Sequence, residues 1–153
     1  MEGGHWVFVL VFLSHVGSSQ SSHSSNAKLL LSLKSAIVDP SGFLDGWREA
    51  NYSHYCSWAG VQCDSFDRII GLDISNMNLS GQIAPQIGYF HSLINFSVAA
   101  NKFTGPFPSN ITNGLGLKSF NICSSMFVGN FPTNFSKLKA LEILATLKQH
   151  TLS

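Results

Sequence analysis

Three cysteines and six histidines are the residues of this chain best suited to redox or metal chemistry. Cys56 and Cys63 enclose six residues, including Trp58, and two cysteines this close in an oxidising compartment predict a disulfide that staples a small cap. A zinc site would need four ligands at recognisable spacing, and His54 is the only histidine nearby in the sequence. We therefore expect a disulfide and no metal. Cys123 is left as an odd thiol.

Catalytic motifs are absent from the sequence. It contains no H-E-x-x-H, no G-x-S-x-G, no G-x-G-x-x-G and no kinase catalytic or metal-binding motif. Gly114-Leu115-Gly116 lacks the third glycine and a preceding strand. We predict that this chain is not an enzyme and uses no cofactor.

Five Asn-x-Ser/Thr sequons could accept N-linked glycans, at Asn51, Asn78, Asn95, Asn110 and Asn134. With only 17 charged residues, surface polarity must come largely from 23 serines and 11 asparagines, as in a secreted glycoprotein. We expect Asn51 and Asn110 to be the most accessible, in loops. Asn95 is the least favoured, because a glycan there would crowd the face of a predicted strand and block any ligand.

The N-terminus predicts secretion. Residues 6–13 form an apolar run of eight, too short to span a bilayer, and small residues follow at 17–19. We interpret residues 1–19 as a signal peptide and 20–25 as a polar linker; a buried core strand is the alternative, but no turn or partner pattern follows. No other run approaches membrane length, so we expect no membrane span. The net charge of +1 gives no reason to expect nucleic acid as a partner.

After the N-terminal region, the chain follows a 24-residue repeat, and the elements of this repeat would position any binding site there. The stretch LINFSVAANKFTGPFP, from Leu93 to Pro108, fits the frame L-x-x-L-x-L-x-x-N-x-L of a leucine-rich repeat, with Asn101 at the Asn position. Copies stand 24 residues before and after it, which predicts repeats at 69–92, 93–116 and 117–140 and a broken fourth at 141–153. Each Asn amide is expected to bond backbone groups at the turn after the strand. Met77 and Ser125 occupy that position in the first and third copies.

The cap is predicted at 26–66. The apolar residues 29, 30, 33, 36 and 37 follow helical spacing from Asn26 to Val38, and Asp39-Pro40 should end the helix. Its apolar stripe needs a surface to cover, and the open end of the repeat stack is the nearest candidate.

The order LLLSLKSAIVDPSGFLDGW, CSWAGVQC and IIGLDISNMNLSGQI resembles the N-terminal cap and first repeats of plant leucine-rich repeat receptor-like kinases over about residues 27–144. The resemblance implies a right-handed α/β-type solenoid with a parallel sheet on its concave face. It also implies plant cell-surface signalling, with a peptide or protein ligand and a co-receptor as partners. The family's Ser/Thr kinase domain and membrane helix have no counterpart here. Gly81, Gly105 and Gly129 stand where this frame turns tightly, with positive φ expected.

Strand alternation predicts which side chains face outward. The exposed columns should hold Gly71, Asp73 and Ser75, then Asn95, Ser97 and Ala99, then Ser119, Asn121 and Cys123. Asp73, Ser97 and Asn121 form one polar column and are the candidate ligand-facing residues. None of these nine is a Trp, Tyr or Arg, the types enriched at binding hot spots, so solvated sheet is the alternative.

We therefore predict a non-catalytic extracellular recognition module located in the apoplast. A secreted inhibitor of cell-wall-degrading enzymes is one alternative, although the second disulfide cap usual in such inhibitors has no cysteines at 140–153. A non-functional gene fragment is another.

Overall fold

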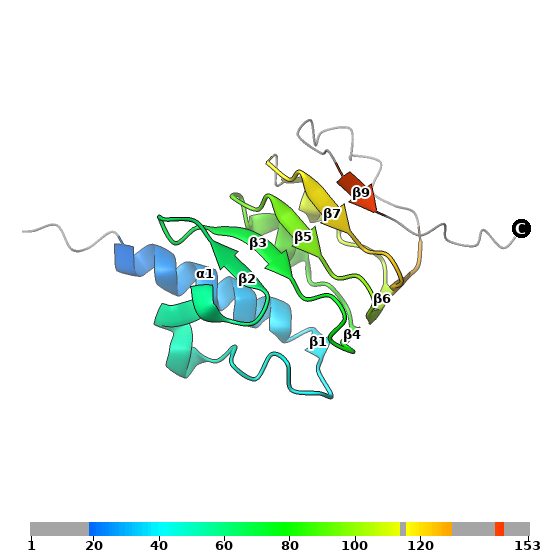
Figure 1. Cartoon of the computed structure of the whole chain (residues 1–153), viewed down its shortest axis with the longest axis horizontal. Helices are drawn as coiled ribbons and strands as arrows, with labels where there is room; N and C mark the ends of the chain where they lie inside the picture. Colours follow the sequence, from blue (N-terminus) through cyan, green and yellow to red (C-terminus); the bar gives the residue numbers. More distant parts are fainter. Residues whose placement is uncertain (1–18, 114–115, 130–142, 146–153) are drawn as a thin grey trace, which may run out of the picture.

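The computed structural model describes residues 19–113, 116–129 and 143–145. Two sheets run side by side along the stack, with an N-terminal helix across one end (Figure 1). The larger sheet has the order β2-β3-β5-β7-β9, and the smaller has the order β1-β4-β6-β8. The strands of the larger sheet are β2 (Val61–Cys63), β3 (Ile69–Asp73), β5 (Asn95–Ser97), β7 (Ser119–Asn121) and β9 (Ile143–Ala145).

Strand pairing in the larger sheet follows the sequence period. β3, β5, β7 and β9 pair in parallel, and Gly71 lies opposite Asn95, 24 residues later, which in turn lies opposite Ser119. The expected parallel sheet is present. At its N-terminal edge, β2 pairs antiparallel with β3, a strand that the repeat pattern did not predict.

Three strands of the smaller sheet, β4, β6 and β8, follow β3, β5 and β7 of the larger sheet along the chain, whereas β1 precedes them all. The smaller sheet contains β1 (Ile37–Val38), β4 (Ser80–Gly81), β6 (Lys102–Gly105) and β8 (Met126–Phe127). The three glycines expected to have positive φ do so, with values of 92° at Gly81, 79° at Gly105 and 90° at Gly129. This prediction is confirmed.

Phenylalanines fill the space between the two sheets. The rings of Phe96 and Phe120 stack at 5.9 Å, those of Phe103 and Phe127 stack at 6.3 Å, and Phe107 meets Phe120 and Phe127 edge to face. All five are buried, so their expected core role is confirmed; Phe131 lies outside the described residues. Offset and edge-to-face pairs add to the stability that apolar burial supplies.

Asn101 holds the turn between the two sheets. Its Oδ1 accepts the backbone N–H groups of Met77 and Leu79, and its Nδ2 donates to the carbonyls of Ile74, Val98 and Ala99. The expected bonding of the amide to backbone groups is confirmed. At the equivalent place one repeat later, the Ser125 hydroxyl donates to the Val98 carbonyl at 3.2 Å and replaces only part of this set.

The N-terminal helix differs from its prediction. Helix α1 spans Ser19–Lys34, so it begins at the last residue of the expected signal peptide, runs through the expected linker and ends before Val38. Residues 37–38 instead form β1, which pairs antiparallel with β4, and Ala36 O accepts the Gln82 N–H at 3.0 Å. Lys34 Nζ donates to the carbonyls of Leu44 and Trp47 just beyond the helix. The pairing of β1 with β4 therefore ends the helix before Asp39-Pro40, where the sequence predicted its end.

Helix α1 buries Ala27, Leu30 and Leu33 against the 3-10 helices η1 (Glu49–Ser57) and η2 (Pro85–Tyr89). Since η2 belongs to the first predicted repeat, α1 covers the end of the stack as expected. A third 3-10 helix, η3 (Ser109–Asn113), packs on η2.

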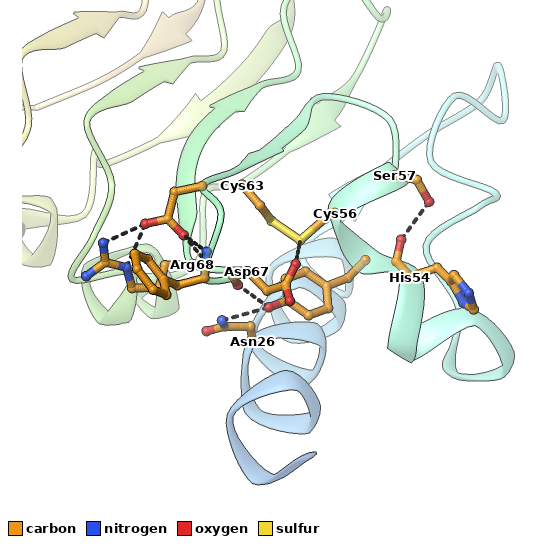
Figure 2. Close-up of a disulfide and its surroundings, with 10 residues drawn as sticks. Asn26, His54, Cys56, Ser57, Cys63, Asp67 and Arg68 are labelled. Atoms are coloured by element: carbon orange, nitrogen blue, oxygen red, sulfur yellow. Dashed lines mark hydrogen bonds and ion pairs between the residues drawn. A yellow bond between two sulfur atoms is a disulfide. The ribbon is translucent and has the colours of Figure 1, made fainter. Parts of the chain in front are cut away.

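The disulfide joins η1 to β2. Cys56 and Cys63 are bonded, which confirms the sequence prediction (Figure 2). Beside it, the Tyr55 hydroxyl accepts from Asn26 Nδ2 at 3.1 Å and donates to the Asp67 carbonyl, so α1, η1 and the β2–β3 turn are tied together. Within the described ranges, no helix has the length and apolar character needed to cross a membrane.

Candidate functional site

The larger sheet carries an open hollow on its outer face. Its volume is about 320 Å³, and strands β2, β3, β5 and β7 supply its walls. Its lining includes Gly71 and the buried Leu72 and Phe96, whose side chains are 1% exposed. The remaining lining residues are polar, with one carboxylate among them: Gln62, Asp73, Asn95, Ser97, Ser119 and Asn121. Parallel pairing at a constant register gathers these residues, because each repeat adds the same column position to the same face.

The structure brings the three predicted ligand-facing residues together. Asp73 lies opposite Ser97, and Ser97 lies opposite Asn121, in one row across three strands. Asp73 is exposed, whereas Ser97 and Asn121 are half-buried. The row therefore exists as a continuous polar line across the sheet.

Asp73 and Asn121 each use one side-chain oxygen to fix the following turn. Asp73 Oδ1 accepts the backbone N–H of Ser75, and Asn121 Oδ1 accepts that of Cys123, each at 3.0 Å. Both side chains are thereby oriented before any partner arrives. Asp73 Oδ2 and Asn121 Nδ2 are the atoms through which the row can accept from, or donate to, a ligand.

Two of the nine positions expected to be exposed are buried. Gly71 lies beneath the side chain of Gln62, whose Oε1 would be 2.6 Å from a Cβ at this position, and Ala99 is also buried. The cause at Gly71 is the antiparallel pairing of β2, which sets Gln62 opposite it. Sequence reasoning missed Gln62 as a lining residue because nothing in the 24-residue period marks β2 as a strand.

Among the residues that the structure describes, Asp73 is the single ionisable side chain that lines the hollow. The described part of the chain holds no cluster of three or more His, Cys, Asp or Glu residues able to bind a metal. The hollow is therefore suited to hydrogen bonding with a polar partner, and its one carboxylate favours a cationic group near β3.

The perturbed ionisable groups lie in the cap, away from the hollow. Burial is the main reason that the pKa of Tyr55 is raised above its ordinary value, and the hydrogen bond from Arg68 holds the pKa of Asp64 below its usual range. Arg68 also forms an ion pair with Asp64 at 2.6 Å and lies over the Phe66 ring. These groups stabilise the β2–β3 turn.

The sequons are placed differently from expectation. Asn51 and Asn110 are half-buried and lie in the 3-10 helices η1 and η3, not in open loops. Asn78 and Asn95 are exposed, and Asn95 lines the hollow. Asn134 lies outside the described residues.

Cys123 follows β7 in a turn, where it is half-buried and forms no disulfide. Its carbonyl accepts the Ala100 N–H at 2.8 Å. The backbone of Cys123 is therefore tied to the preceding turn, two residues after Asn121 of the polar row.

Comparison with known proteins gives the family. Residues 11–64 match the model of the leucine rich repeat N-terminal domain, which covers the cap described above. The chain is 34% identical over 110 residues to MDIS1-interacting receptor like kinase 1 of Arabidopsis thaliana, and 37% identical over 110 residues to the LRR receptor-like serine/threonine-protein kinase GSO2 of the same plant. These matches cover 69% and 70% of this chain but only 11% and 9% of the relatives.

A solved structure agrees with these relatives. The LRR ectodomain of the plant membrane receptor kinase GASSHO1/SCHENGEN3 from Arabidopsis thaliana superposes with a TM-score of 0.69 at 31% identity, over 75% of this chain and 14% of that one. The chain is thus a leucine-rich repeat protein with the N-terminal domain of this class. More particularly, it belongs with the plant leucine-rich repeat receptor-like kinases and corresponds to the N-terminal part of their extracellular domain.

Proposed function

We propose that this chain is a non-catalytic extracellular recognition module that binds a peptide or protein through the outer face of the larger sheet. In this proposal it is a short solenoid of about three leucine-rich repeats, closed at its N-terminal edge by the stapled cap. The observation that carries the proposal is the hollow of about 320 Å³ crossed by the row Asp73, Ser97 and Asn121.

The chemistry of the face sets the kind of ligand. Its side chains offer amides, hydroxyls and one carboxylate, which suits an extended polar segment with a cationic side chain near Asp73. Among the described lining residues the one aromatic, Phe96, is 1% exposed and none is an arginine, so the hollow by itself supplies modest affinity. It would act as one part of a larger contact that a co-receptor or further repeats complete.

The relatives support an extracellular role. The GASSHO1/SCHENGEN3 ectodomain was solved in complex with CASPARIAN STRIP INTEGRITY FACTOR 2, so a neighbour in fold and sequence binds a partner. Placement of this chain in the apoplast or at the plasma membrane is part of the proposal, as is any link to a kinase. Since the chain spans about a tenth of its curated relatives, their signalling activity is not transferred.

A selection experiment tests this function. The chain is produced unglycosylated, with its disulfide formed, in an oxidising bacterial compartment and used to select from a multivalent peptide display library. Enriched peptides should lose binding to the triple variant Asp73→Ala/Ser97→Ala/Asn121→Ala. They should keep binding to Lys102→Ala, an exposed position on the smaller sheet. Peptides that bind the triple variant unchanged would overturn the proposal.

A further inference from the structure

Asn95 combines a sequon with a place inside the hollow. In Asn95-Phe96-Ser97, Phe96 points into the core with 1% exposure, whereas Asn95 is exposed on the outer face. The acceptor amide therefore projects away from the sheet, over the site of the proposed function. Ser97 is both the hydroxyl residue of this sequon and the middle residue of the polar row.

The surroundings of Asn95 leave room for a sugar. Its register neighbours across the sheet are Gly71 and Ser119, and neither has a long side chain, although the Gln62 side chain lies over Gly71. Neighbouring strands lie about 4.8 Å apart, so a bulky glycan rooted on β5 would extend over the columns of β3 and β7. Gln62 and Ser119 offer an amide and a hydroxyl to the first sugar. The fold can carry this glycan without moving a core side chain, and the hollow would be covered.

The half-buried sequon at Asn110 is less well suited to carry a glycan in the folded chain. Asn110 packs against Gly88, where an added Cβ would lie 2.6 Å from Asn110 Cβ, and its sequon residue Thr112 is buried with its hydroxyl donating to Ser109 O. Asn78 resembles Asn95 in exposure, and its Nδ2 makes only a 3.4 Å contact with Ser41 Oγ. Asn78 therefore serves as the internal reference for Asn95.

We propose that Asn95 carries an N-linked glycan that closes the sheet-face hollow, so that its occupancy decides whether this face can bind; the proposal rests on the function proposed above. The oligosaccharide comes from a lipid diphosphate donor in the secretory pathway. The Asn95 side-chain nitrogen forms a bond to the anomeric carbon and loses one proton. The bond from that carbon to the diphosphate oxygen breaks, and the lipid diphosphate leaves.

The first measurement is occupancy. The full chain is secreted from eukaryotic cells, and glycopeptide mass spectrometry follows Asn95 and Asn78 in the wild type, in Asn95→Gln and in Ser97→Thr, the matched control that keeps the sequon. A glycan on Asn95 is expected in the wild type and in Ser97→Thr, and Asn95→Gln should lose it alone. Unmodified Asn95 beside glycosylated Asn78, or a chain with no glycan, would overturn the proposal.

The second measurement is access to the hollow. In a Cys123→Ser background, Ser119→Cys is labelled with a polymer-linked maleimide; Asp73→Cys is the second reporter. Labelling should become several-fold faster after enzymatic deglycosylation or with Asn95→Gln, because the bulky glycan is gone. Equal rates would refute closure. Neither measurement uses a ligand, so a negative result in either one overturns the glycan proposal alone. Failure of the proposed binding function would be seen separately, if Asn95→Gln chains select no peptides.

Discussion

Replacing Asn101 by alanine tests the packing of the stack most sharply. The side chain is 5% exposed, and its Oδ1 accepts the N–H groups of Met77 at 3.1 Å and Leu79 at 3.0 Å. Its Nδ2 donates to three carbonyls, the shortest contact being 2.7 Å to Ile74 O. Alanine keeps the backbone but removes the side-chain amide, so all of these backbone groups lose their hydrogen bond to it at once.

The expected loss follows from the groups left unpaired. Each buried donor or acceptor without a partner costs about 1–3 kcal/mol, and several share one turn here, so we expect Asn101→Ala to lower the free energy of unfolding by about 3–5 kcal/mol. Folded domains have total free energies of unfolding of roughly 5–15 kcal/mol, so this loss would be a large fraction of the total. The comparison change Asn121→Ala removes one hydrogen bond from a half-buried side chain and should cost about 1 kcal/mol.

Urea unfolding followed by two probes measures these differences. Far-ultraviolet circular dichroism reports on the sheets, whereas fluorescence of the stacked Trp47 and Trp58 reports on the cap. Coincident transitions would justify two-state analysis. If Asn101→Ala costs no more than Asn121→Ala, the account of the turn is wrong.

Three further predictions concern the cap and one turn. The double variant Cys56→Ser/Cys63→Ser should lower the free energy of unfolding by about 2.5 kcal/mol, the chain-entropy value for a short loop, as measured by urea against the oxidised wild type. Gly105→Ala should cost about 1–2 kcal/mol because φ is 79° there; Gly46→Ala, with open space around it, should be near neutral in the same assay, and equal losses would contradict the assignment. Burial raises the folded-state pKa of Tyr55 above the ordinary value of 10.0. The contribution of the protonated Tyr55 to the free energy of unfolding is therefore complete below pH 10.0 and is lost as the pH rises through the folded-state pKa. Tyr55→Phe should flatten that alkaline fall in the urea midpoint, and an unchanged slope would show that another group causes it.

The sequence predicted what depends on its period and on local chemistry. The polar row, the positive φ at Gly81 and the bonding of Asn101 all follow from one repeated frame, because parallel pairing at a fixed offset copies each position to the next strand. The disulfide of the cap followed from short spacing. Local patterns of this kind are visible in a single sequence.

Features that depend on long-range pairing were not visible. Helix α1 ends early because residues 37–38 pair with β4, and Gly71 is buried because β2 places Gln62 over it. The exposure of Asn95 relative to Asn110 likewise depends on how η2 and η3 pack. In each case the outcome depends on contacts with a segment distant in the sequence, and the 24-residue pattern does not reveal those contacts.

The central claim is that the polar row on the larger sheet contacts a ligand. A photo-crosslinking amino acid placed at position 97 of the unglycosylated chain, or at position 102 as control, tests it directly with a selected peptide. The account predicts a crosslink from position 97, in the middle of the hollow, and none from position 102 on the smaller sheet. Crosslinking from position 102 with none from position 97 would contradict it.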